Sequence, residues 1–497
     1  MKPLSRIVPD KLLASLFVSF ALCATAQAAS VVLINADAAG QGLNDPTPAT
    51  PEGGNTGTTL GQQRLIALQY AANIWAAQLQ STVPIRIRVQ FPTAGFACES
   101  EPFGFVYLGY SGPTGYYTGN PPYPPEPTVY PVALRNALIG TVANPALPEI
   151  AAQFSPLLDS TPNCMSGFSG FWYGIDRNIP IPEGNLQFPF VTLATHEFAH
   201  GMGFIAGINV GDGSGFPPYH FVWERLLYDT ETDKYWDQMS NAERVASATN
   251  DPNLVWRGNN VNGAAANYLR PPARLRAGAS VLNGDVLAAA FAERIPRDGL
   301  AERAVLVDDG SANGSQGCGP LVNAAAVQGR IAIARRGTCG FGVKTRNAQA
   351  AGAIAILILN DRVETSGDPL PVAGASDHTL VIPTFTVAFQ TGVNLLDAIG
   401  SNPNVVVTIE SVSAAPDLGT HEGFLRMDAP AVLEPSTSVN HFSRDQATPL
   451  LMKGSISLWN FDRNDMTVDL LRDIGWTLTP GSGNTIFSAG FETFTPR

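Results

Sequence analysis

Apolar and polar positions follow two different periods over the first hundred residues. Residues 61–79 carry apolar side chains at helical spacing, which predicts a helix. Residues 84–91 alternate strictly between apolar and polar, which predicts a strand with one face in solvent. A shorter apolar run at residues 31–34 predicts an earlier strand. A helix followed by such a strand fits the N-terminal half of an α/β or α+β domain.

The periodic pattern weakens between residues 100 and 147, where prolines and tyrosines predict a structured surface loop. Further helices are expected at residues 148–158, 191–204, 221–229 and 241–249. Glycines mark the end of the second of these, and Ser240 is a suitable N-cap for the last.

The chain changes character between about residues 270 and 415. Short apolar runs there predict strands at residues 304–308, 329–334, 353–359 and 380–385. Residues 341–351 have a helical pattern between two of these runs, so this region forms a compact β-rich module. Residues 416–478 resume a different pattern, and a Gly-Ser-Gly linker at 481–483 leads to a short tail.

The composition narrows the class of protein. A chain of 497 residues is too long for one hydrophobic core, so two or three domains are expected. Its formal net charge of −12 makes it a poor candidate for binding nucleic acid or an anionic membrane. Charged residues make up only 14%, while 45% apolar content argues against disorder.

The N-terminus predicts a secretory signal peptide over residues 1–28. Lys2, Arg6 and Lys11 precede an apolar stretch at 12–24, and small residues at 26–28 suit a signal peptidase. Removing these residues takes away three positive charges and Asp10, so the net charge changes from −12 to −14. The apolar stretch is short for a membrane span, although an uncleaved anchor is the alternative. No later stretch is long and apolar enough to cross a membrane.

The cysteine count fits an exported chain. Beyond Cys23 in the signal peptide there are four cysteines, and an even number in an exported protein suggests disulfides. Of the three pairings that four cysteines allow, we expect Cys98–Cys164 and Cys318–Cys339, because each then closes within one proposed domain.

The helix at 191–204 carries His196, Glu197 and His200 as His-Glu-x-x-His. Residues four apart lie on one helix face with Cβ atoms about 5–6 Å apart, so both histidines can bind one zinc ion. Glu197 lies one step round the helix and suits a general base acting on a zinc-activated water. The alternative is two ordinary histidines on an amphipathic helix. The chain has only six histidines and this helix has apolar flanks, which favours the metal site.

A catalytic zinc ion needs a third protein ligand and an open position. The residues alone leave several candidates, namely His441, His421, His220 and Glu224. His378 lies in the β-rich module and is interpreted as a loop residue.

The segment from His196 to Gly203 resembles the start of the metzincin zinc-binding motif, His-Glu-x-x-His-x-x-Gly. In most metzincins a third histidine follows three residues after this glycine, but here that position is Ala206. In leishmanolysin-like metzincins it comes after a long insertion and before a methionine turn. The segment 438–442 around His441 and the later Met452 are similar to these features, and residues 471–476 fit that family's final helix.

The leishmanolysin resemblance implies that His441 is the third ligand and that Met452 forms the floor beneath the metal. The sequence departs from the family at Lys453-Gly454, where a proline-containing turn is more usual. Plain core packing is therefore the alternative role for Met452.

The β-rich module resembles the protease-associated domain, a non-catalytic domain thought to restrict access to an active site or to bind protein substrates. The resemblance rests on residues 317–321, 329–341, 344–352 and 355–360. It implies that the run from Arg335 to Cys339 is a turn held by the Cys318–Cys339 bridge rather than a basic binding patch.

Together the two resemblances imply an α+β fold in which a metzincin-like catalytic domain is split by a protease-associated domain. The expected boundaries are residues 1–28 for the signal peptide, 29–270 and 416–480 for the two parts of the metallopeptidase domain, 271–415 for the inserted domain, and 481–497 for the linker and tail. Such an insertion requires its two ends to lie close together at the surface.

The expected function is a secreted zinc endopeptidase that acts on extracellular proteins or peptides. Its metal ligands are His196, His200 and His441, and its general base is Glu197. The alternatives are a zinc hydrolase of a non-peptide bond and a non-catalytic binding or adhesion protein. The tail is similar to short C-terminal segments of exported proteins of some Gram-negative bacteria. This predicts an extracellular location, with the periplasm and the cell surface as alternatives.

Overall fold

A computed structural model describes most of the chain between Ala28 and Pro480. The described residues are 28–98, 106–118, 128–165, 168–176, 186–269, 273–288, 296, 298–361, 380–411, 419–434, 436–444, 450–454 and 465–480. Residues 1–27 of the predicted signal peptide, His378 and the C-terminal tail lie outside them. No helix in the described part has the length and apolar character needed to cross a membrane.

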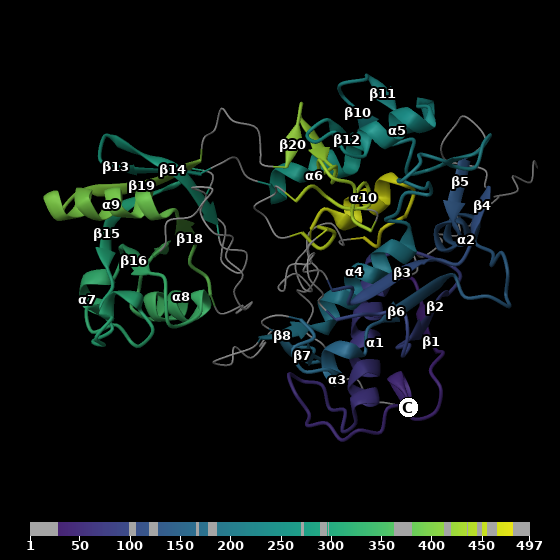
Figure 1. Cartoon of the computed structure of the whole chain (residues 1–497), viewed down its shortest axis with the longest axis horizontal. Helices are drawn as coiled ribbons and strands as arrows, with labels where there is room; N and C mark the ends of the chain where they lie inside the picture. The colour runs from purple at the N-terminus through teal and green to yellow at the C-terminus, as the bar shows by residue number, and fades with distance from the viewer. Residues whose placement is uncertain are drawn as a thin grey trace, which may run out of the picture.

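A four-stranded sheet and two long helices form the centre of the first part of the chain (Figure 1). The sheet has the order β1 (Val31–Asn35), β2 (Ile85–Gln90), β6 (Ile150–Phe154) and β3 (Gly109–Pro113). The first three strands run parallel, and β3 pairs antiparallel with β6 at the edge. Helix α1 (Leu60–Gln78) packs over β1, while α4 (Phe190–Met202) packs over β6 and β3 and against α1. The strands and helix predicted at 31–34, 84–91 and 61–79 are confirmed.

Three secondary-structure predictions in this part are wrong. The expected loop at 100–147 contains β3, β4 (Tyr116–Thr118), β5 (Thr128–Pro131) and α2 (Val132–Ile139). The expected helix at 148–158 is the strand β6 followed by the single turn α3 (Leu157–Ser160). The expected helix at 221–229 is β9 (His220–Phe221), a turn and β10 (Leu227–Asp229).

The strands in these three regions were missed for the same physical reason. These strands are short, and distant partners rather than a local apolar pattern define them. β3 pairs with β6, β5 with β9, and β10 with β12 (Leu254–Trp256). In β6 the buried residues Ile150, Ala152 and Phe154 alternate with half-buried ones, a period of two over only five residues.

A second sheet joins chain segments from before and after the β-rich module. Its antiparallel order is β11 (Lys234–Tyr235), β10, β12, β21 (Phe424–Arg426) and β20 (Thr420–His421). The β12–β21 pair sets Trp256 opposite Leu425. Helix α6 (Asn259–Tyr268) packs against α10 (Thr467–Asp473), which includes residues 471–473 of the final helix predicted at 471–476. Helix α5 (Asn241–Ser247) has the predicted N-cap, because Ser240 and Glu243 form a capping box.

The β-rich module is a closed barrel (Figure 1). Its strands, in order around the barrel, are β13 (Ala273–Ala277), β14 (Ser280–Ala288), β18 (Thr384–Val387), β17 (Ala355–Leu359), β16 (Ile331–Arg335), β15 (Leu300–Leu306) and β19 (Val406–Ser411). Its helices are α7 (Ala324–Val327), α8 (Phe341–Ala350) and α9 (Phe389–Ser401). The first and last strands pair antiparallel with Ala273 opposite Ser411, so the entry and exit of the barrel lie side by side.

The remaining described elements are short. They are the parallel pair β7 (Phe168–Trp172) and β8 (Leu186–Pro189) and the 3-10 helices η1 (Gly42–Asn44), η2 (Trp236–Gln238) and η3 (Gly314–Gln316). Both expected disulfides, Cys98–Cys164 and Cys318–Cys339, are confirmed.

The buried side chains divide between the barrel and the rest of the chain. One core contains residues from Ala29 to Leu269 together with residues from Leu425 to Trp476. The barrel has two clusters of its own, one around Leu357 and one around Ile356 on opposite faces of β17. The segments before and after the barrel therefore share one hydrophobic core.

Candidate metal centre

Helix α4 holds two of the candidate histidines in a buried position. Among its residues His196 and Glu197 are buried, and His200 is half-buried at its C-terminal end. Trp75 of α1 donates its Nε1–H to the carbonyl oxygen of Thr195 at 3.0 Å, which anchors the helix beside His196. The helix ends at Gly203, whose φ of +115° is a left-handed conformation that favours glycine.

The third histidine arrives on a loop from beyond the barrel. The N–H of Asp428 donates to His441 O at 2.9 Å, and the N–H of Val439 donates to Asp428 O at 2.7 Å. Val439 has a φ of +72°, which is uncommon for a β-branched residue. Asn440 accepts the N–H of Ala206 on its Oδ1 at 2.7 Å, so this loop is attached directly to the segment that follows α4.

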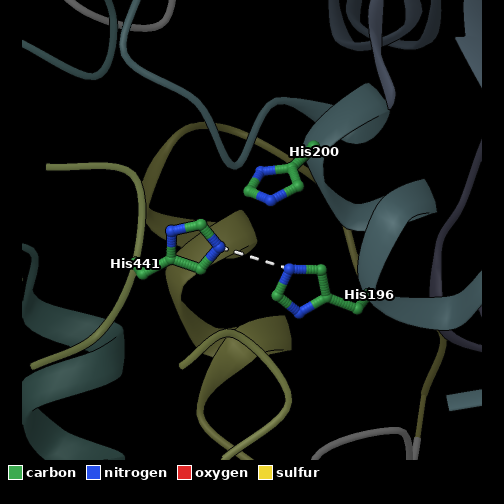
Figure 2. Close-up of side chains that lie close together, drawn as sticks. All are labelled: His196, His200 and His441. Carbon is green, nitrogen blue, oxygen red and sulfur yellow. Dashed lines mark hydrogen bonds between the residues drawn. The ribbon is translucent and has the colours of Figure 1, made fainter. Parts of the chain in front are cut away.

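Figure 2 shows the imidazole rings of His196, His200 and His441 turned toward one another, with ligand atoms that all lie within 4.8 Å of each other. The Nδ1 atoms are hydrogen-bonded to backbone carbonyl oxygens, His196 to Leu451 at 2.6 Å, His200 to Phe204 at 2.7 Å and His441 to Thr437 at 2.9 Å. Because a carbonyl oxygen can only accept, each Nδ1 carries the proton. The Nε2 atom of each neutral ring is then a lone-pair donor.

These three rings are neutral near pH 7. Burial lowers the pKa of His196 to about 3 and that of His200 to about 4. Burial and the two neighbouring imidazoles hold the pKa of His441 well below its ordinary value. The neutral, Nδ1-protonated form is the one that binds metals through Nε2.

The contact between His196 and His441 tests whether a metal ion fits. Their Nε2 atoms lie 3.2 Å apart, as the dashed line in Figure 2 marks. With both Nδ1 atoms protonated, two lone pairs face each other, an arrangement that a shared cation would stabilise. Two nitrogens at about 2.0–2.1 Å from a tetrahedral zinc ion are about 3.3 Å apart. The donor set and its spacing therefore suit zinc.

Glu197 lies on the same helix, against the edge strand β3. It is 5% exposed, and burial raises its pKa to about 8. A Cβ atom built on Gly109 of β3 would lie only 3.2 Å from Cγ of Glu197. β3 pairs with β6 on one side, and no other described strand pairs with its second edge. Gly109 of this edge strand therefore lies beside the Glu197 side chain.

The other candidates for a third ligand lie elsewhere in the fold. His421 is half-buried in β20, where it pairs with Phe424. His220 Nδ1 lies 3.4 Å from Oε2 of the buried Glu224, whose pKa burial raises to about 7. Within the described residues, the three-residue cluster with metal-ligand spacing consists of His196, His200 and His441.

Residues 450–453 form a turn that contacts His196. Met452 is fully buried and its carbonyl oxygen accepts the N–H of Phe442 at 2.8 Å, while Leu451 O accepts from His196. Sequence reasoning missed Gly109 and Asp465, a buried carboxylate that accepts the N–H of Leu451. A glycine in a weakly patterned strand and an aspartate before a helix carry no sequence signal of either contact.

Comparison with known proteins identifies the barrel. Residues 301–395 match the family model of the PA domain, so the resemblance of this module is confirmed. The ER degradation-enhancing alpha-mannosidase-like protein 3 of Xenopus laevis is 34% identical over 112 residues, 22% of this chain and 12% of that protein. The PIII-type proteinase of Lactococcus lactis subsp. cremoris is 36% identical over 99 residues, 20% of this chain and 5% of the proteinase. The chain thus spans about an eighth or less of the length of these curated relatives.

Two solved structures show limited similarity. An aminopeptidase from Aneurinibacillus sp. strain AM-1 aligns with a TM-score of 0.23 and 23% identity over 29% of this chain and 31% of that chain. The subtilisin-like protease Apa1 from Pseudoalteromonas sp. AS-11 aligns with a TM-score of 0.21 and 14% identity over 41% and 46% of the two chains.

Proposed function

We propose that this chain is a secreted zinc-dependent endopeptidase of the leishmanolysin-like metzincin type, with a PA domain inserted into its catalytic domain. The observation that carries the proposal is the cluster of His196, His200 and His441, whose ligand atoms all lie within 4.8 Å of one another. Residues 29–270 and 416–480 form the catalytic domain in this proposal. The shared hydrophobic core of these segments supports it.

The chemistry follows from the residues around the proposed metal ion. Zinc, when bound by three imidazoles, supplies a Lewis acid that polarises a carbonyl and lowers the pKa of a water ligand towards about 7. Glu197 is the general base that takes the proton from the attacking water and passes it to the leaving nitrogen. Burial alone raises its pKa, and the positive charge of a bound zinc ion would lower it towards the ionised form that this role needs. Met452 forms the floor beneath the histidines, and its complete burial suits this position.

The edge strand β3 supports cleavage within a peptide chain. An extended peptide can add to an exposed strand edge through main-chain hydrogen bonds. β3 offers such an edge over Gly109–Pro113, and at Gly109 it lies against Glu197. A peptide paired along this strand would have residues on both sides of the reacting carbonyl, as an endopeptidase requires. The PA domain would restrict access to this site or bind the protein substrate.

Export is part of the same proposal. The predicted signal peptide would direct the chain out of the cytoplasm of a Gram-negative bacterium. The two disulfides support an oxidising compartment, because such bonds form and persist there.

A Glu197→Gln variant tests the catalytic assignment. It should keep its zinc, because Glu197 is not a ligand in this proposal, and should lose cleavage of casein. Wild-type protein should also cleave a peptide blocked at both termini, which an aminopeptidase would leave intact. Equal casein cleavage by the two proteins would contradict the role of Glu197. Zinc binding without cleavage of any peptide would favour a hydrolase of another bond.

A further inference from the structure

The turn at residues 450–453 contacts both segments that carry the histidines. Its Leu451 carbonyl oxygen accepts the Nδ1–H of His196 at 2.6 Å. Its Met452 carbonyl oxygen accepts the N–H of Phe442, the residue after His441, at 2.8 Å. Met452 and Phe442 are fully buried, so the turn is enclosed by the core. A shift of this turn would therefore alter the orientation of His196 and the support of His441 together.

A buried carboxylate binds the backbone of this turn. Asp465 is 6% exposed, and its Oδ2 accepts the N–H of Leu451. Its Oδ1 accepts the N–H of Thr467, the first residue of α10, at 2.8 Å. Hydrogen bonds to an ionised acceptor are roughly twice as strong as neutral ones, and removing the acceptor leaves a buried N–H unpaired.

Leu451 lies between Asp465 and His196 in this chain of hydrogen bonds. Its N–H binds Asp465 and its carbonyl oxygen binds His196, so one residue links the carboxylate to the imidazole. We infer that Asp465 is a positioning residue, which fixes the orientation of His196 through Leu451 and thereby sets the metal affinity without touching the metal. This inference rests on the proposed metal site.

The alternative is that Asp465 only attaches α10 to the core, and the same helix provides a matched control. Asp473 is 2% exposed and accepts hydrogen bonds from the N–H groups of Asn260 and Val261 and from Nε1 of Trp256. These bonds lead to α6 and β12 rather than to the turn at 450–453. A purely structural effect should therefore appear equally in both aspartates.

The test uses the full-length protein carrying Asp465→Asn or Asp473→Asn. Zinc affinity is measured by competition with a chromophoric chelator at fixed pH, and the cobalt-substituted proteins are compared by visible absorption. Asp465→Asn should lose about 10–100-fold in zinc affinity, the usual effect of removing an outer partner of a ligand, and should change the cobalt spectrum. Asp473→Asn should unfold more readily but keep wild-type affinity and spectrum.

A second variant keeps the test decisive if Asp465→Asn folds poorly. Asp465→Glu keeps the carboxylate but displaces it by one methylene, so its zinc affinity should fall below the wild-type value and stay above that of the asparagine variant. Wild-type affinity in either Asp465 variant, or an equal loss in Asp473→Asn, would overturn the positioning role alone. A wild-type protein that binds no zinc would overturn the proposed function, and this inference with it.

Discussion

At the scale of single residues, the three histidines share one arrangement although they come from different surroundings. Each Nδ1–H donates to a backbone carbonyl oxygen, those of Leu451, Phe204 and Thr437. Backbone carbonyl oxygens therefore orient all three rings directly. The cost of burying the polar ring is offset by this hydrogen bond.

Gly109 gives a residue-scale prediction about the general base. A Cβ there would lie 3.0 Å from Cδ1 of Phe154 and 3.2 Å from Cγ of Glu197, so we expect the larger side chain of Gly109→Val to push the Glu197 side chain out of position. A misplacement of about 1 Å can cost about 100-fold in rate, so kcat/KM should fall by about that factor while zinc content stays unchanged. Gly263→Val is the control, because Gly263 is exposed on α6 and a Cβ there meets nothing within 4 Å. Equal losses in the two variants would argue against a specific effect on Glu197.

At the scale of elements, helices and strands with a strong local sequence pattern were predicted correctly, and those with a weak pattern were not. The apolar residues three and four positions apart in α1, the alternation in β2 and the capping box of α5 made these elements predictable. The edge strand β3 contains Gly109, Gly112 and Pro113, which predict turns, and only pairing with β6 makes it a strand. The spacing of His196 and His200 on one helix was visible in the sequence. His441 could be named only through a family resemblance, because the whole sequence of the barrel lies between it and the two histidines that it contacts.

The loop that carries His441 gives a prediction at this scale. Arg444 bridges Asp428 and Glu434, and its hydrogen bond to Glu434, supported by Thr437, lowers the pKa of that carboxyl. A lowered folded-state pKa stabilises the protein above the unfolded value of about 4.3, and this contribution is lost as the pH falls through the folded value. Because Arg444 is 43% exposed, the effect should stay below about 1 kcal/mol.

The measurement is urea unfolding of wild-type protein and Glu434→Gln at pH 7 and at pH 3. The variant should be less stable at pH 7, and the difference should shrink at pH 3. Glu422→Gln, at an exposed glutamate, should match the wild type at both values. A difference between wild type and Glu434→Gln that grew in acid would contradict the sign of this prediction.

At the scale of the whole molecule, the barrel is inserted in the sequence between two segments that share one hydrophobic core. The antiparallel β13–β19 pair brings the two ends of the barrel together, as an insertion into a folded domain requires. A change of composition revealed this module in the sequence, and its parallel strands were readable because they are continuous apolar runs. The rejoining of residues 29–269 with 425–476 could not be read locally, because it depends on pairings such as β12 with β21.

Separate cores predict separate unfolding transitions. Removing zinc with 1,10-phenanthroline should lower the melting temperature of the part that contains the histidines. The loss in its free energy of unfolding should be about 4 kcal/mol if zinc was present at about a thousand times its Kd. Leu357→Ala truncates a fully buried side chain in the barrel. It should lower the free energy of unfolding of the barrel alone, by about 2–5 kcal/mol. Differential scanning calorimetry distinguishes these effects. A single transition that both changes shift equally would show that the two parts unfold as one unit.

The return of His441 to the helix of His196 and His200 is the central claim, and anomalous X-ray diffraction at the zinc edge tests it most directly. Crystals of the purified protein should show one anomalous peak about 2.0–2.1 Å from the Nε2 atoms of all three histidines. A peak bound by His196 and His200 with His421, His220 or Glu224 in place of His441, or no peak at this centre, would contradict the account.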